Sequence, residues 1–260
     1  MNEKQHSDTT KIAVVTGGSR GIGRSIALRL GHNGCTVAVH FGQNKDAAED
    51  VVAEIEADGG RAFAFGADLA DPEVETGFWR SFDIAAAEKG LDAERVDILV
   101  NNAGVTLRGA IEEMGREDFL TQQAVNTNAP YFIVKRALPR MGEGGRIVNI
   151  SSGVTRIAFP EIIGYALTKG AIDAFTLTLA KHVGPRGITV NAVAPGVIDT
   201  DINASWLRDN QEAQEGVAAG TALGRVGQAD DVAGIVAFLA SDDARWITGQ
   251  VVDATGGTQL

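Results

Sequence analysis

Several features that would point to other protein classes are missing or scarce in this chain. The 260 residues contain one cysteine, Cys35, which excludes an intramolecular disulfide framework and a cysteine-rich zinc module. No segment approaches the roughly 20 consecutive apolar residues that a membrane span needs. Lysine and arginine total 23 against 34 aspartates and glutamates, a net charge of -11, which argues against a nucleic-acid partner because such partners need a basic footprint. The 4 histidines show no paired ligand spacing, so we expect no metal site.

The two parts of the chain differ in composition. Residues Met1–Thr10 are polar and lack the apolar stretch of a secretory signal, so we expect a flexible tail and a cytoplasmic protein. Residues 11–260 contain no linker, internal repeat or low-complexity segment. We expect them to form one domain, which is long enough to bury a sizeable core.

Short β-branched apolar runs alternate with longer segments of helical periodicity. The expected strands are Ile12–Thr16, Thr36–Phe41, Ala62–Gly66, Asp97–Asn101, Arg146–Ser151, Ile188–Ala194 and Gln250–Asp253. The expected helices are Ile22–Leu30, Ala48–Ile55, one that starts with Asp71 as cap and Pro72 at its first position, Asp118–Met141, Gly164–Val183 and Asp230–Ala240. This alternation predicts an α/β fold with a doubly wound, seven-stranded parallel sheet and helices on both faces.

A glycine cluster, Thr16–Gly23, follows the first expected strand and opens the first helix. Its spacing is G-x-x-x-G-x-G, not the commoner G-x-G-x-x-G. Glycines let the backbone approach a pyrophosphate, whose charge is met by free N–H groups at the helix start. The alternative is a plain glycine-rich turn. The placement favours a Rossmann-type dinucleotide site that comprises Gly17, Ser19, Arg20, Gly21, Ile22 and Gly23.

The choice between the two nicotinamide dinucleotides depends on the end of the second expected strand. An NAD site usually places a carboxylate there to bind the ribose 2′-hydroxyl. The expected strand ends in His40 and Phe41. Between this strand end and Asp46 the sequence has no carboxylate. A 2′-phosphate is attracted by a guanidinium such as that of Arg20. NADP(H) is therefore favoured over NAD(H), with His40 as a further candidate contact.

Both tyrosines of the chain are followed by a lysine four residues later. On a helix this spacing places the two side chains on one face, where an ammonium group favours ionisation of the phenol. Tyr165 follows a strand that ends in Ser151 and Ser152, so it would lie where open α/β sheets bind ligands. Tyr131 and Lys135 lie within an apolar helix and are interpreted as a structural pair.

With these motifs in this order, the chain resembles the short-chain dehydrogenase/reductase family, and within it the 3-oxoacyl-[acyl-carrier-protein] reductases. The resemblance runs from about Lys11 to Gly257. The matching landmarks are Thr16–Gly23, Asp68 and Leu69, Asn101–Gly104, Asn126, Ser152, Tyr165, Lys169, Asn191, and Pro195 and Gly196 through Thr200.

The resemblance implies a role for each landmark in hydride transfer between NADP(H) and a carbonyl or alcohol. Tyr165 would be the proton donor or acceptor and Ser152 would bind the substrate oxygen. Lys169 would hold the nicotinamide ribose and lower the pKa of Tyr165, while Asn126 would anchor a water molecule that links Lys169 to solvent. The implied cofactor contacts are Asp68 and Leu69 at the adenine, Asn102, Ala103 and Gly104 along the cofactor, Pro195 and Gly196, and Val197 and Thr200 at the carboxamide. For Asn126 the alternative is a helix kink ahead of Pro130.

The substrate and the assembly are less clear from sequence. The family implies a substrate lid over residues 201–222 and a homotetramer or dimer that packs through Asp118–Met141 and Gly164–Val183. Phe159, Ile162 and Ile163 suggest an apolar wall. An acyl carrier protein would need a basic patch, for which Arg108, Arg116, Arg136 and Arg156 are candidates. The net charge leaves a free ketone, ketoester, quinone or sugar open.

Two rival functions and one departure from the family pattern complete the expectations. A hydrolase with a Ser–His–acid triad is disfavoured because His182, its candidate base, lies at a probable helix end. A regulatory protein that senses NADP(H) without turnover is the main alternative, and NADPH consumption would distinguish the two. The last expected strand continues as Val252–Gly257, two residues longer than the Val-Asp-Gly-Gly typical of the family.

Overall fold

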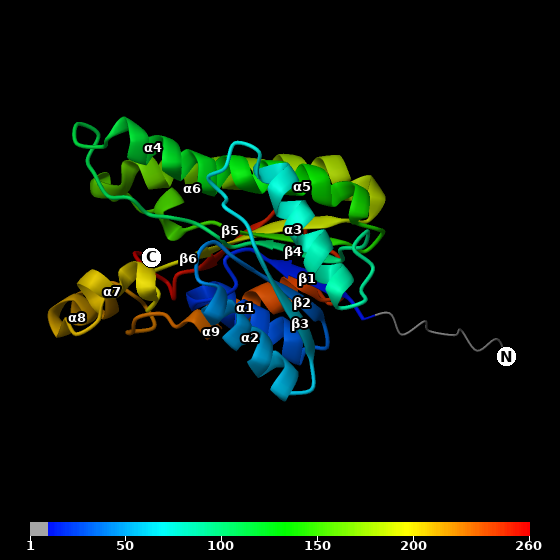
Figure 1. The fold of residues 1–260 in the computed structure, drawn as a ribbon. Coiled ribbons are helices and arrows are strands. Elements are labelled where there is room, and N and C mark those ends of the chain that lie inside the picture. The colour runs from blue at the N-terminus through cyan, green and yellow to red at the C-terminus, as the bar shows by residue number, and fades with distance from the viewer. Residues whose placement is uncertain (1–9) are drawn as a thin grey trace.

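The computed structural model describes residues 10–260, so the tail expected over Met1–Thr10 lies almost wholly outside it. Its centre is a parallel sheet of seven strands in the order β3-β2-β1-β4-β5-β6-β7 (Figure 1). The strands are β1 (Ile12–Val15), β2 (Thr36–Phe41), β3 (Arg61–Gly66), β4 (Ile98–Asn101), β5 (Arg146–Ile150), β6 (Thr189–Pro195) and β7 (Val251–Ala254). The predicted doubly wound parallel sheet is confirmed.

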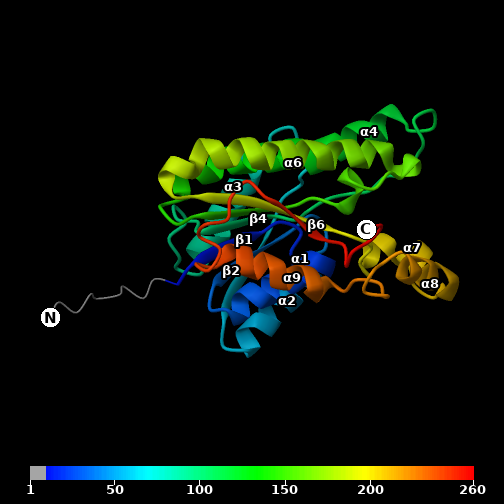
Figure 2. The same cartoon turned by 180° about the vertical axis from the view of Figure 1, so that it is seen from behind.

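Helices cover both faces of the sheet (Figures 1 and 2). One face carries α1 (Gly21–His32), α2 (Lys45–Ala57) and α9 (Ala229–Ala240). The other carries α3 (Val74–Glu88), α5 (Ala129–Ala137) and α6 (Ile163–Val183), with α4 (Arg116–Gln123) next to α6. Strands β1, β4, β5 and β6 are buried at every position, which explains why they are apolar without alternation.

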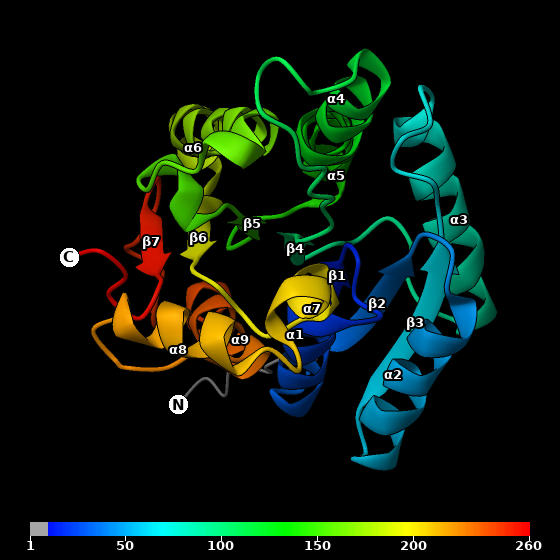
Figure 3. The same ribbon diagram turned by 90° about the vertical axis from the view of Figure 1, so that its left-hand side faces the viewer.

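The strand order reverses between β1 and β4, because the chain crosses from β3 at one edge back to the middle of the sheet. In open α/β sheets this reversal leaves a crevice beyond the carboxyl ends of the strands, and ligands bind there. Helices α7 (Asp201–Leu207) and α8 (Gln211–Ala219) lie at this end of the molecule, as the end-on view shows (Figure 3). These two helices lie within the segment expected to be a lid.

Two helix boundaries differ from the prediction. Helix α3 begins at Val74 and not at Pro72, because the carboxylate of Asp71 accepts the backbone N–H of Glu73 at 2.7 Å and forms a turn ahead of the helix. The continuous helix predicted over Asp118–Met141 is also wrong. It consists of α4, a π-helical turn at Ala124–Asn128, α5 and a short 3₁₀ turn at Leu138–Arg140.

Proline explains the π-helical turn. Pro130 has no N–H, so the carbonyl four residues earlier, on Asn126, has no α-helical donor. The chain accommodates this with a wider turn, in which Ala129 donates to the carbonyl of Ala124. The kink considered for Asn126 is therefore present, and it sets the orientation of that side chain. Among the described residues, no helix combines the length and apolarity that a membrane crossing requires.

Candidate active site

A cavity of about 1290 Å³ opens at the carboxyl ends of the strands, in the region where Figure 3 shows α7 in front of the sheet. Every predicted site residue except Asn126 lines it. The cavity thus brings together Gly17, Ser19, Arg20, Gly21, Ile22, Gly23, His40, Asp68, Leu69, Asn102, Ala103, Gly104, Ser152, Tyr165, Lys169, Pro195, Gly196, Val197 and Thr200.

The glycine loop is shaped by its neighbours. Gly17 has φ +62° and Gly21 has φ +53°, a region that favours glycine. A side chain at Gly23 would lie 2.1 Å from the carbonyl oxygen of Gly17. The amide of Asn102 donates to the carbonyls of Thr16 and Gly17 at 2.8 and 3.2 Å. Asn102 therefore fixes the loop from the next strand, so its cofactor role is at least partly indirect.

His40 lies behind the glycine loop and is only 1% exposed. Its Nδ1 accepts the N–H of Gly17 at 3.1 Å, and its Nε2 donates to the carbonyl of Ala67 at 3.0 Å. Burial lowers the pKa of His40 to about 4, although the hydrogen bond to Ala67 opposes this shift. A neutral imidazole thus joins the loop after β1 to the loop after β3. Its geometry supports a positioning role more than direct contact with a ligand.

The region near the loop can accept a phosphate. Arg20 is exposed, lines the cavity and has no ion-pair partner among residues 10–260. Gly42, Gln43 and Asn44, which follow β2, line the cavity as well, and they were not predicted as contacts. They directly follow the strand end that the sequence analysis considered, and none is a carboxylate. This edge therefore carries a positive charge and offers no acid to repel a phosphate.

Tyr165 and Lys169 lie one turn apart on α6, with the Lys169 nitrogen 5.5 Å from the centre of the tyrosine ring. The ammonium of Lys169 is buried and donates to the carbonyl of Ile150, at the end of β5, at 2.8 Å. Burial lowers the pKa of Lys169 to about 8, opposed by the charge of Asp173. Lys169 is therefore mostly protonated at neutral pH, yet close enough to titration to exchange a proton.

The phenol of Tyr165 is flanked by two hydroxyl groups, those of Ser152 and Thr106. Burial raises the pKa of Tyr165 above its ordinary value, and hydrogen bonds from Ser152 and then Thr106 act in the opposite direction. The protein alone therefore keeps the phenol protonated. Thr106 was not predicted as a site residue. Its position two residues after the Asn101–Gly104 landmark was the available signal.

Asn126 lies outside the cavity wall and uses its whole amide group. Its Oδ1 accepts the N–H of Val105 at 2.8 Å, and its Nδ2 donates to the carbonyl of Val105 at 2.8 Å and to Thr168 Oγ1 at 3.1 Å. The side chain therefore ties the segment after β4 to the helix that carries Tyr165 and Lys169. The water molecule implied by the family resemblance stays a prediction.

The second tyrosine lies away from these groups. Tyr131 is 54% exposed, and its ring packs edge-on against Phe132, with Phe175 nearby. Lys135 Nζ donates to Glu75 at 3.2 Å. The pair has neither the burial nor the hydroxyl neighbours of Tyr165, in agreement with the structural interpretation.

Apolar and aromatic side chains line part of the cavity. Phe159 and Ile162 line it as predicted, but Ile163 points outward and is 43% exposed, so that part of the predicted wall is wrong. Trp206 of α7 closes the wall, and the guanidinium of Arg108 lies 5.8 Å from the centre of its indole ring. A ring system can therefore lie against aromatic side chains next to Tyr165.

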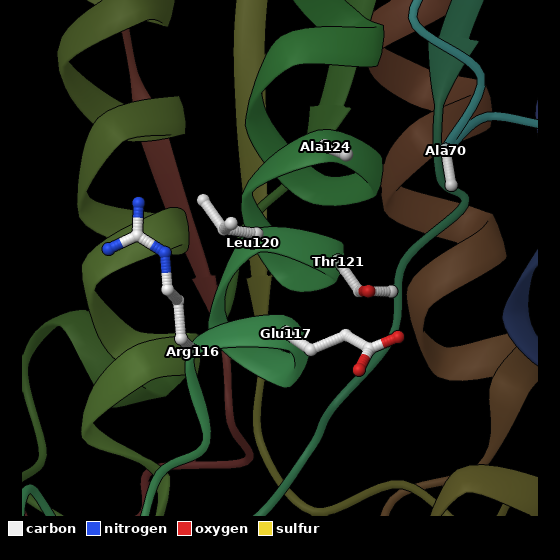
Figure 4. A pocket seen from close by; sticks show the side chains of 6 residues that line it. All are labelled: Ala70, Arg116, Glu117, Leu120, Thr121 and Ala124. Carbon is white, nitrogen blue, oxygen red and sulfur yellow. The ribbon is translucent and has the colours of Figure 1, made fainter.

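The four arginines considered for a carrier-protein patch do not form an open basic surface at this mouth. Arg108 lies 3.9 Å from Glu161, and Arg156 pairs with Asp253. Arg116 belongs to a separate hollow of about 460 Å³ on α4, together with Glu117 and Leu120 (Figure 4). Arg136 does not line the cavity. Carboxylates thus offset the charge of two of these four arginines, Arg108 and Arg156.

The extended C-terminal sequence contributes to the cavity. Thr255 occupies the space beside Gly153 and Gly196, where a side chain on either glycine would collide with it. The following backbone pairs with the segment after α8, since Ala222 and Leu223 donate to the carbonyls of Gly257 and Gly256 at 3.1 Å each. Thr258 and Gln259 then line the cavity, and they were not predicted from sequence. The longer ending therefore holds the lid segment at its C-terminal end.

Comparisons with known proteins agree with this geometry. A family model described as "Enoyl-(Acyl carrier protein) reductase" matches residues 17–259. This chain belongs to the short-chain dehydrogenase/reductase family. It is 43% identical to an uncharacterized oxidoreductase of Methylorubrum extorquens, with 96% of this chain and 98% of the relative covered. It is 38% identical to the 3-oxoacyl-[acyl-carrier-protein] reductase FabG of Staphylococcus aureus, with 96% and 99% covered.

Two solved structures are close in both sequence and shape. The promiscuous reductase LugOII, which catalyses a keto-reduction at C1 in lugdunomycin biosynthesis, is 46% identical with a TM-score of 0.92, covering 97% of this chain and 99% of the other. The angucycline C-6 ketoreductase LanV with bound NADP is 47% identical with a TM-score of 0.90, covering 96% of each chain. The predicted family, oxidoreductase class, carbonyl chemistry and NADP(H) preference are thus confirmed.

Proposed function

We propose that the protein uses NADPH to reduce a ketone on a free, flat, fused-ring aromatic compound to a secondary alcohol. One observation carries this proposal. The hydroxyls of Ser152 and Thr106 flank the phenol of Tyr165, with the ammonium of Lys169 on the same helix, inside a cavity that Phe159 and Trp206 also line.

The described residues fit NADP(H) along the inner part of the cavity. Gly17 and Gly21 let the backbone approach a pyrophosphate, and the bare Cα of Gly23 lets the start of α1 pack directly against the carbonyl of Gly17. The unpaired guanidinium of Arg20 would hold the 2′-phosphate, with Gln43 beside it. Asp68 and Leu69 would flank the adenine, and Val197 and Thr200 would contact the carboxamide.

The catalytic roles follow from the positions of three side chains. When bound, NADPH supplies the hydride to the carbonyl carbon. Ser152 and Tyr165 donate hydrogen bonds to the carbonyl oxygen, and these bonds strengthen as negative charge develops there. Tyr165 then transfers its proton to that oxygen. Lys169, with a pKa of about 8, stabilises the resulting phenolate and remains mostly protonated at neutral pH.

Substrate class is argued from the wall and from the relatives. Trp206 and Phe159 present aromatic faces, against which a flat ring system gains more than its buried area alone. Relatives named as a versicolorin reductase and a hydroxynaphthalene reductase-like protein, both 38% identical, and the ketoreductase LanV are consistent with ring ketones. A carrier-bound thioester is disfavoured because carboxylates face Arg108 and Arg156.

The proposal extends to assembly and location. Apolar side chains are exposed on α6 and near the β7 edge, with Leu167 at 56% and Trp246 at 96% exposure. We propose a homotetramer in which the predicted segments Asp118–Met141 and Gly164–Val183, the latter containing Leu167, form one interface. The surface around Trp246 is added here as a second interface, since D₂ tetramers use two distinct symmetric interfaces. A cytoplasmic location also stays a prediction.

The test is NADPH oxidation by the purified protein with a panel of carbonyl compounds: an aryl ketone with fused rings, a linear 3-oxoacyl thioester, a quinone and a sugar. We expect the highest kcat/KM with the fused-ring ketone, and a lower rate when NADH replaces NADPH. Preference for the linear thioester would overturn the substrate class. Cofactor binding without oxidation of NADPH by any compound would favour the sensor alternative.

The variant Trp206→Leu refines this assay. We expect it to raise KM for the fused-ring ketone while kcat/KM for a small linear ketone stays near that of the wild type. An equal loss for both substrates would mean that Trp206 supports the lid and does not select the ring system.

A further inference from the structure

The segment from Gly104 to Leu107 passes between the helix that carries the catalytic pair and the π-helical turn. Gly104 lies so close to both that an added Cβ would be 3.3 Å from Asn126 Oδ1 and 3.6 Å from Lys169 Nζ. This contact fixes the start of the segment beside the ammonium group. Thr106, two residues further on, lines the cavity with Ser152, Tyr165 and Lys169.

Buried amide side chains hold the backbone on both sides of Thr106. Asn126 bonds both the N–H and the carbonyl of Val105, each at 2.8 Å. Gln122, which is 0% exposed, accepts the N–H of Leu107 at 3.0 Å. Gln122 of α4 and Asn126 of the π-helical turn thus hold the backbone on both sides of Thr106, which lines the same cavity as Tyr165 and Ser152.

Ser152 cannot donate a hydrogen bond to the substrate and to Tyr165 at the same time. A serine hydroxyl has one proton to donate. Once Ser152 donates it to the substrate oxygen, it has none left for Tyr165. The phenol, however, becomes negatively charged as it releases its proton, and a buried charged oxygen without a donor is costly.

We propose that Thr106 is a positioning residue that donates a hydrogen bond to the Tyr165 oxygen as the phenolate forms, while Ser152 is engaged with the substrate. Asn126 and Gln122 hold it in place for this task. The inference rests on the proposed role of Tyr165 in carbonyl reduction. In this proposal, Asn126 holds the backbone of Val105 and thereby positions Thr106.

The first test is spectroscopic and needs no substrate. The chain has 2 tyrosines, so Tyr131→Phe leaves Tyr165 as the only phenol whose ionisation changes the ultraviolet absorbance of tyrosinate. In that background we expect Thr106→Val to raise the titration midpoint of Tyr165 by about one pH unit, as loss of a hydrogen bond to a charged oxygen predicts. Thr106→Ser keeps the hydroxyl and is expected to leave the midpoint unchanged.

The second test uses turnover of the best ketone. Thr106→Val is expected to lower kcat roughly tenfold and to move the loss of reduction at high pH upward, with KM changed less than twofold. Thr121→Val, which removes the same hydroxyl from the hollow on α4, is the matched control and is expected to behave as the wild type. If Thr106→Val does not fold, Thr106→Ala serves in both tests.

The outcomes separate this inference from the proposed function. Near-normal turnover by Tyr165→Phe would overturn the role of Tyr165 and the inference with it. Loss of turnover in Tyr165→Phe, together with an unchanged titration midpoint in Thr106→Val, would overturn the inference alone. A rise in KM without any shift of the midpoint would mean that Thr106 contacts the substrate instead, and would also overturn it.

Discussion

At the scale of single residues, the chemistry depends on a phenol that the protein alone keeps protonated. Burial raises the pKa of Tyr165, and hydroxyl groups only partly offset this. A protonated phenol suits the direction of carbonyl reduction, in which Tyr165 gives its proton away. Alcohol oxidation, which needs the phenolate, would depend more on the positive charge of the oxidised cofactor. The site therefore favours the protonated form of Tyr165, which is the form that carbonyl reduction requires.

Removal of the Tyr165 hydroxyl tests this assignment directly. Tyr165→Phe is expected to bind NADPH normally, measured by nucleotide fluorescence, and to lose at least about 100-fold in kcat, the usual scale of acid–base help. Tyr131→Phe is the matched control, because its ring is exposed and packs only against Phe132 and Phe175. A large loss in Tyr131→Phe with the fold intact would show that the wrong tyrosine was chosen.

His40 gives a prediction about pH and stability. Its pKa is about 4 in the folded protein and about 6.5 when unfolded, so the unfolded chain binds the extra proton between these values. The stability that depends on neutral His40 is thus full above about pH 6.5 and is lost as pH falls towards 4. The shift corresponds to about 3 kcal/mol. His40→Asn keeps an acceptor for Gly17 but does not titrate.

The measurement is urea unfolding of the wild type and of His40→Asn at several pH values. We expect the difference in unfolding free energy between the two proteins to change by up to about 3 kcal/mol from pH 6.5 to pH 4. Carboxylates that titrate in this range contribute equally to both and cancel. Parallel curves for the two proteins would show that His40 is not held neutral.

Many of the predicted site residues follow strands, since the carboxyl ends of parallel strands meet at one edge. Ser152 was predicted in this way and pointed to Tyr165, whereas Gly42, Gln43 and Asn44, which directly follow β2, were missed. Thr106 and Gln259 were not, because each reaches the cavity through the path of a loop or of the C-terminal segment. His40 was assigned to the cofactor, but its bond to Gly17 depends on a burial that strand periodicity does not reveal.

At the scale of elements, the helix that is interrupted by a π-helical turn carries Asn126, a residue of the predicted site. Strand positions followed from apolar runs, and most predicted bounds agree with the structure within a residue or two. The π-helical turn at Ala124–Asn128 was not predicted, since Pro130 suggests a kink without specifying how the chain resolves it. Helices α7 and α8 were likewise anticipated only as a lid of unknown order. The segment that follows α8 is held by distant partners, since Ala222 and Leu223 donate to the carbonyls of Gly257 and Gly256.

The π-helical turn leads to a prediction for Asn126. Asn126→Leu would leave the partly buried N–H and carbonyl of Val105 without their side-chain partners, at a cost of roughly 1–3 kcal/mol in unfolding free energy. Asn128→Leu changes the same turn at an exposed position and is expected to stay within about 0.5 kcal/mol of the wild type. Urea unfolding at pH 7 measures both. Equal effects in the two variants would mean that the amide of Asn126 does not hold the segment after β4.

At the scale of the whole molecule, several large apolar side chains of the described residues stay exposed once the core is complete. Two of them, Leu167 on α6 and Trp246 near the β7 edge, are the candidates for subunit interfaces, and Trp246 is 96% exposed. Large apolar side chains at the surface mark interaction sites when they gather into patches. Strand order and assembly were beyond prediction from the residues, because periodicity shows which face of an element is apolar but not which partner covers it.

A homotetramer with two distinct symmetric interfaces makes a definite prediction about partial disruption. Leu167→Glu and Trp246→Glu each place a charge in one interface, so each single variant is expected to form dimers and the double variant monomers. Ile84→Glu, at an apolar position of similar exposure on α3, is the control and should remain tetrameric. Light scattering after size-exclusion chromatography measures the mass in solution. The double variant disrupts both proposed interfaces, so a double variant that stays tetrameric would mean that the interfaces lie elsewhere. A monomeric wild type would rule out the tetramer itself.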